Sequence, residues 1–187
     1  MNQMDDGRTV DQLMSGIEHL LDDFDRIGRF GVETYRRYDP AFLVDHDDRA
    51  AACCIYSHML AEAARRLDRQ PGITPVDVRG LKVWLVGDAA VIRFKKTDED
   101  GRSRTYPTKQ ARSYDRGELL PGLPPPAARL TVGYLLDEMG TTVRRVQVSR
   151  PNGKRVAWCA AIVPTENSVA GQLRWQDVTK QRSLGDR

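Results

Sequence analysis

The chain has no apolar run approaching the roughly 20 residues that a membrane-spanning helix requires. Residues 1–16 carry acidic side chains instead of the basic start and apolar centre of a signal peptide. We therefore expect a cytoplasmic protein with no membrane partner. With 187 residues, of which 40% are apolar and 29% charged, the sequence is typical of a globular protein with one sizeable core.

Cysteine and histidine are scarce, with three of each in the chain. Cys53 and Cys54 are adjacent and poorly placed to bridge each other, and Cys159 lies in an apolar segment. We interpret all three as buried, reduced thiols. The histidines form no HxxxH or HExxH pair, and the acidic runs at residues 45–48 and 98–101 are typical of a helix start and a turn. The sequence thus predicts no catalytic residue, metal site or cofactor.

Charge is distributed unevenly, although the formal net charge is only +3. Residues 1–80 carry 10 basic and 15 acidic side chains, whereas residues 81–187 carry 19 basic and 11 acidic ones. An acidic first part followed by a basic second part indicates different tasks, or a face where the two parts neutralise each other.

Residues 10–27 predict an amphipathic helix that begins near Thr9, a suitable N-cap. Its apolar residues follow alternating spacings of three and four: Val10, Leu13, Ile17, Leu20, Phe24 and Ile27. Such a narrow stripe packs against another helix, in this chain or in a second copy. A homodimer through residues 10–30 therefore stays open.

A second helix is predicted over residues 50–67, where apolar side chains again recur at helical spacing. Asp47 or Asp48 can cap its start. Because Asp39-Pro40 breaks the chain between the two helices, we favour a helical hairpin within one chain.

The second half of the chain predicts five strands, at residues 81–86, 89–96, 129–136, 142–150 and 155–163. The Gly87-Asp88 and Asn152-Gly153 turn signals each join two of them into a hairpin. A short helix over residues 108–116, entered at Pro107, separates the second strand from the third. We expect an α+β fold, with an N-terminal helical hairpin followed by a mostly antiparallel five-stranded sheet and one or two short helices.

Composition divides the chain into three parts. We expect an acidic helical hairpin over residues 1–70 and a basic α+β domain over residues 71–164. A proline-rich connector, residues 120–127, lies within the second part. Residues 165–187 predict a short helix and a loose tail.

The segment from residue 89 to residue 114 concentrates basic side chains on one strand, a loop and the following helix. Several cations on one surface are what binding to phosphates requires. We therefore expect this segment to bind nucleic acid or an acidic protein partner through Arg93, Lys95, Lys96, Arg102, Arg104, Lys109, Gln110, Arg112 and Tyr114. A second basic set flanks the Asn-Gly hairpin: Arg144, Arg145, Arg150, Lys154 and Arg155.

The order of elements also resembles the core of PD-(D/E)xK nucleases. That resemblance implies Glu62, Asp88 and Lys95 as active-site residues, and residues 110–114 match a QxxxY motif. The position two before Lys95 is Arg93, however, where an acidic metal ligand is needed, and a cation there repels Mg²⁺. A metal-dependent, nuclease-like enzyme with a degenerate core is the alternative function.

The run IRFKK…GRSRTYPTKQ, followed by GYLLD and KRVAWCAAI, resembles a widespread but uncharacterised group of small bacterial proteins. The resemblance covers residues 81–162. It implies a bacterial origin and an accessory role in toxin–antitoxin or phage-defence gene sets. We therefore expect a non-enzymatic cytoplasmic binding protein that engages a protein partner or nucleic acid through its basic sheet and loop surface.

Overall fold

The structure is a computed structural model that describes residues 7–104, 108–123 and 127–179. Its helices are α1 (Val10–Ile17), α2 (Leu21–Tyr35), α3 (Pro40–Leu43), α4 (Asp48–Leu67) and α5 (Lys109–Asp115), with 3₁₀ turns at Glu18–Leu20 and Thr165–Asn167. Its strands are β1 (Ile73–Val78), β2 (Leu81–Val86), β3 (Ala90–Lys96), β4 (Ala128–Leu136), β5 (Val143–Asn152), β6 (Arg155–Ile162) and β7 (Trp175–Asp177). The predicted α+β class is confirmed.

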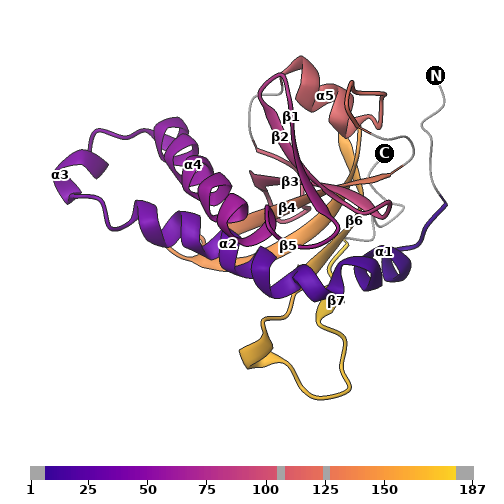
Figure 1. Cartoon of the computed structure of the whole chain (residues 1–187). Coiled ribbons are helices and arrows are strands. Elements are labelled where there is room, and N and C mark those ends of the chain that lie inside the picture. Colours follow the sequence, from indigo (N-terminus) through magenta and orange to yellow (C-terminus); the bar gives the residue numbers. More distant parts are fainter. Residues whose placement is uncertain (1–6, 105–107, 124–126, 180–187) are drawn as a thin grey trace, which may run out of the picture.

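The strands of the described residues form one sheet in which they lie side by side in chain order, from β1 to β7. Neighbouring strands are antiparallel except β3 and β4, which are parallel. The crossover between these two strands contains α5, on the face opposite the other helices (Figure 1). The sheet is thus mixed, and its single parallel pair places α5 over the middle of the sheet.

The predicted number of five strands is wrong, because β1 and β7 add one strand at each edge. Pro75 and Asp77 disfavour a strand in β1, but Pro75 is tolerated at an edge because it has no N–H to donate. At β7 the sequence predicts a helix through Trp175. The chain instead forms a 3₁₀ turn at Thr165–Asn167 and a three-residue strand.

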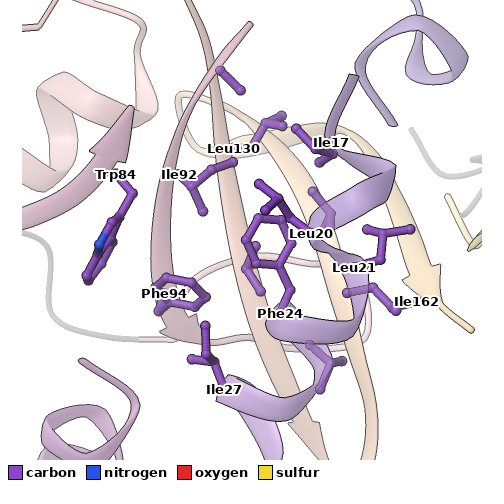
Figure 2. Close-up of a cluster of buried hydrophobic side chains, with 14 of the residues drawn as sticks. Ile17, Leu20, Leu21, Phe24, Ile27, Trp84, Ile92, Phe94, Leu130 and Ile162 are labelled. Atoms are coloured by element: carbon purple, nitrogen blue, oxygen red, sulfur yellow. The ribbon is translucent and has the colours of Figure 1, made fainter. Parts of the chain in front are cut away.

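The stripe on the first helix packs mainly on the sheet. Phe24 contacts Phe94 edge to face, with ring centroids 5.9 Å apart, and Figure 2 shows Leu20 and Phe24 pointing towards Ile92 and Leu130. A 3₁₀ turn at Glu18–Leu20 bends the helix so that α1 and α2 both follow the sheet. The helices and the sheet therefore share one hydrophobic core.

The helical hairpin of α2 and α4 forms within one chain. At Gly31 an added Cβ would lie 2.5 Å from Cγ of Met59, so the two helices approach closely there. Leu13, Ile17, Leu20, Phe24 and Ile27 are at most 2% exposed in this arrangement. Because these side chains are buried within one chain, they are not available to form the homodimer through residues 10–30 that the sequence left open.

Helix starts follow the predicted capping chemistry. The hydroxyl of Thr9 accepts a hydrogen bond from the backbone N–H of Gln12, and the side chain of Gln12 accepts one from the backbone N–H of Thr9. Asp47 caps α4 as predicted. Thr108, which the sequence prediction placed inside the short helix, is instead the N-cap of α5. Pro107, residues 124–126 of the connector and residues 180–187 of the tail lie outside the described residues. No helix in the described part of the chain is long and apolar enough to span a membrane.

Candidate anion-binding site

Tyr114 anchors α5 to the sheet. Its side chain is fully buried, and its hydroxyl oxygen lies 2.6 Å from the carbonyl oxygen of Val91 on β3 and 2.7 Å from that of Leu130 on β4. The ring packs with Val83, Val91 and other apolar residues in a small core on this face of the sheet. Tyr114 therefore has a structural role and is not exposed as predicted for partner contact.

Arg93 is the second anchor. It is 2% exposed, its Nη2 lies 2.5 Å from Oδ1 of Asp115, and its Nε donates to Oγ1 of Thr131 at 2.9 Å. The guanidinium also lies over the ring of Tyr114, 4.5 Å from the centroid. Burial raises the pKa of Asp115, although the positive charge of Arg93 opposes that rise. An arginine on β3 and an aspartate at the end of α5 thus neutralise each other beneath the helix.

A cleft with a volume of about 310 Å³ opens above this pair. Arg93 and Thr131 on the sheet, and Asp115 on α5, belong to its lining. The other lining side chains come from α5, the loop after β3 and the β5–β6 hairpin: Arg102, Ser103, Ala111, Arg112, Arg116, Pro151, Lys154, Arg155 and Val156. The segment from β3 to α5 and the β5–β6 hairpin, which are far apart in the sequence, therefore meet at one cavity.

The cleft is strongly basic, because its lining, over the residues that the structure describes, has six cationic side chains and one carboxylate. Arg93 is neutralised by Asp115, while Arg116 lies 3.5 Å from Glu118 in an exposed pair of little strength. Arg102 lies 3.9 Å from Asp100 in another exposed pair. Within the part of the chain that the structure describes, no ion pair involves the other three cations of the lining, the exposed Arg112, Lys154 and Arg155. These side chains can bind an anion without first breaking a salt bridge.

The loop that supplies Arg102 is fixed to the sheet. Nε2 of Gln147 donates to Oγ1 of Thr97 and to the carbonyl of Asp98, and the hydroxyl of Ser149 donates to the carbonyl of Gly101. Gln147 and Ser149 are at most 1% exposed. Because these bonds are buried, the loop holds Arg102 at the rim of the cleft in one position.

The structure brings some of the predicted residues together and separates others. Arg102 and Arg112 line the cleft, whereas Arg104 and Lys109 are exposed outside its lining and Gln110 and Lys96 are half-buried. From the second basic set, Lys154 and Arg155 join the cleft. Arg144 pairs with Glu99 at 3.1 Å, Arg145 donates to the carbonyl of Glu99, and Arg150 donates to the carbonyl of Arg8.

Arg116 was not predicted as part of the site. The sequence prediction places Arg116 in the last turn of the short helix, four residues after Arg112. This i, i+4 spacing is the signal that puts both side chains on one face of the helix. The convergence of the β5–β6 hairpin with α5 has no sequence signal, because it depends on the crossover between β3 and β4.

Lys95 lies apart from the cleft lining, against α4. Its Nζ is 4.1 Å from the centroid of the Tyr56 ring. Burial lowers the pKa of Lys95 to about 8, and the nearby positive charge of Arg93 acts in the same direction. Lys95 is therefore a partly desolvated cation inside the fold, not an exposed binding residue.

Replacing Lys95 by methionine is expected to raise the free energy of unfolding at pH 7 by about 2 kcal/mol. The folded pKa lies below the unfolded value of 10.5. Between these two values the unfolded state binds more protons, so wild-type stability rises with pH and the advantage of Lys95→Met shrinks. Urea denaturation of both proteins at pH 7 and at pH 10 measures this difference. An equal advantage at both pH values would show that Lys95 is not destabilised by its charge.

The residues of the nuclease-like alternative are not assembled into one site. Glu62 is buried and paired with Arg65 and Arg66, each at 2.6 Å. Asp88 lies in the exposed turn before β3 and Lys95 near the other end of that strand, so they are roughly 20 Å apart at about 3.3 Å per residue. Among the described residues, no group of three or more His, Cys, Asp or Glu side chains could hold a metal ion.

The cysteines differ from one another in exposure. Cys159 is buried as predicted, and burial raises the pKa of its thiol to about 12. The prediction is wrong for Cys53, which is exposed on α4, while Cys54 is half-buried. The two adjacent residues point in different directions on a helix, and only one of them faces the rest of the protein.

Comparison of the chain with protein-family models, with curated proteins and with solved structures finds no match. The cleft itself is therefore the feature that indicates a function.

Proposed function

We propose that the protein is a non-enzymatic binding protein that engages an anionic partner through the cleft, and that this partner is a nucleic acid contacted through its phosphates. The observation that carries the proposal is the convergence of cations from α5, the loop after β3 and the β5–β6 hairpin on one cavity. Several cations on one surface release condensed counterions from a nucleic acid, which favours binding without a base-specific motif.

The chemistry of the lining favours phosphates over an acidic protein partner. Protein interfaces usually have a core of large apolar or aromatic side chains that supply most of the binding energy. Among the lining residues the apolar side chains are small or medium-sized, namely Ala111, Pro151 and Val156. Five of the six cations are arginines, whose planar fork binds phosphate oxygens in a bidentate manner. Charge is thus the main feature that the cleft offers to a partner.

The setting of this activity is a separate proposal. The resemblance of residues 81–162 to a group of small bacterial proteins supports a place in bacterial defence or toxin–antitoxin regulation.

Charge reversal in the cleft tests the proposal. We expect the Arg112→Glu/Arg155→Glu double variant to bind a labelled 20-nucleotide single-stranded RNA or DNA at least tenfold more weakly than wild type. The slope of log K against log[salt] should also fall by about 1 for each phosphate contact that is lost. Fluorescence anisotropy at several salt concentrations measures both quantities.

The matched control is Arg36→Glu/Arg37→Glu, which makes the same change in charge on exposed residues at the end of α2. This end of α2 leads to α3, away from α5 (Figure 1). Equal loss of affinity in both double variants would mean that only net charge matters and would refute the cleft as the binding site. Binding to a poly-glutamate peptide, but not to either nucleic acid, would identify an acidic protein as the partner.

A further inference from the structure

We infer that the cleft recognises a compact polyphosphate group, such as the linked phosphates of a nucleoside triphosphate or of a 5′-triphosphate RNA end. This inference rests on the proposed function and specifies the part of the partner that enters the cavity. It depends on four properties of the described lining: its charge relative to its volume, its buried Arg93, its lack of aromatic side chains and its single, already paired carboxylate.

The density of charge is the first property. Arg112, Lys154 and Arg155 have no ion-pair partner in the described residues, and they line one cavity of about 310 Å³. A cavity of that volume measures about 7 Å on a side, which is also about the spacing of side chains on one face of an extended peptide. A peptide can therefore place about one carboxylate in the cleft. Linked phosphates place three or more negative charges in the same space.

The second property is that the floor of the cleft contains the buried Arg93. Arg93 is 2% exposed and lines the cavity, with its charge balanced by Asp115 at 2.5 Å. The floor therefore presents a fixed guanidinium that is already oriented by Thr131 and Tyr114. A fixed donor costs little entropy when a ligand binds, so it favours a small, highly charged group that reaches the base of the cleft.

The lining also predicts which parts of a ligand the cleft does not recognise, namely the base and a bound Mg²⁺. Among the described residues that line the cleft, none has an aromatic side chain on which a base can stack. The one carboxylate in the described lining, Asp115, is paired with Arg93, so this lining offers no free acidic ligand for Mg²⁺. We expect binding to be independent of the base and to weaken when Mg²⁺ neutralises the phosphates.

Isothermal titration calorimetry of the full chain with inorganic tripolyphosphate, ATP, GTP, orthophosphate and citrate tests the inference. We expect tripolyphosphate, ATP and GTP to bind within threefold of one another and at least tenfold more tightly than orthophosphate or citrate. Arg112→Glu/Arg155→Glu should lose this binding, and Arg36→Glu/Arg37→Glu should keep it. Three results would overturn the inference. They are no binding of tripolyphosphate at about 1 mM, an unchanged affinity in the Arg112→Glu/Arg155→Glu variant, and a requirement for Mg²⁺.

Two further arms separate the sources of the polyphosphate from the proposed function. RNA with a 5′-triphosphate is compared with the same RNA carrying a 5′-hydroxyl, and tripolyphosphate is used as competitor. Tighter binding of the triphosphate RNA identifies a nucleic-acid end, whereas binding of free nucleotides without RNA binding identifies a nucleotide and refutes the proposed nucleic-acid function. Equal binding of both RNAs without competition refutes the polyphosphate inference and leaves the proposed function standing.

Discussion

Replacing Arg93 by leucine is expected to lower the free energy of unfolding by about 3–5 kcal/mol, because it leaves a buried carboxylate without its partner. Asp115 is largely buried, and Arg93 is the cation that pairs with it at 2.5 Å. The same substitution removes the hydrogen bond to Thr131 and the cation over the ring of Tyr114. The contacts of Arg93 with Asp115 and Tyr114 join α5 to the sheet, so we expect α5 to detach first.

The pH dependence of this variant identifies the cause. Burial already raises the pKa of Asp115, and removing Arg93 raises it further. A carboxyl group whose folded pKa lies above its unfolded value destabilises the fold when it is ionised, and this cost disappears as the pH falls below the unfolded value. The difference between Arg93→Leu and wild type should therefore be largest near pH 7 and smaller near pH 4.

The Arg93→Leu/Asp115→Leu double variant is the matched control. Replacing both partners by apolar side chains removes the unpaired charge, so the double variant should recover most of the stability that the single variant loses. Urea denaturation of the wild type, Arg93→Leu, Asp115→Leu and the double variant at pH 7 measures the coupling between the two residues. Additive losses would show that the ion pair contributes nothing and that packing alone holds α5.

The sequence could predict this structure where local chemistry decides it. Caps at Thr9 and Asp47 formed as expected because each side chain reaches a free backbone N–H three residues away. The Asn152-Gly153 hairpin formed for a similar reason, since Gly153 adopts the positive φ of 61° that the turn requires. The division into residues 1–70, 71–164 and 165–187 stays a prediction.

The sequence could not predict features that depend on tertiary position. Arg93 looks like an exposed cation on an alternating strand, and only the placement of α5 above β3 and β4 shows that Asp115 neutralises it. Edge strands are a second example. Residues 175–177 are too few to give a periodic pattern, and they form a strand because the edge of β6 pairs with them.

The cleft combines both kinds of feature. Clustering of basic residues is visible in the sequence, and Arg102 and Arg112 were predicted from it. The participation of Lys154 and Arg155 in the same cavity follows from the seven-strand order, in which β5 and β6 lie two and three places beyond β3. The site therefore depends on strand order as much as on charge, and a change in the loop that crosses these strands should affect binding.

Gly101→Ala is expected to destabilise the protein by about 3 kcal/mol and to weaken binding in the cleft. Gly101 has a φ of +80°, which disfavours any residue with a side chain. An added Cβ would also lie 2.7 Å from Cβ of Ser149 and 2.8 Å from Sγ of Cys159, so the loop has to lift from the sheet. Its lifting breaks the hydrogen bond from Ser149 and displaces the neighbouring Arg102.

Gly140→Ala separates the two causes of this effect. Gly140 has a similar φ of +67°, but no atom lies within 4 Å of its added Cβ. It should therefore lose only the conformational part, about 1 kcal/mol, and keep full affinity for tripolyphosphate. Thermal denaturation and calorimetry of both variants give the two quantities. The contrary result is a Gly101→Ala variant that loses no more stability than Gly140→Ala and binds tripolyphosphate as tightly as wild type. That result would refute the idea that close packing of the Gly101 loop on β5 and β6 positions Arg102.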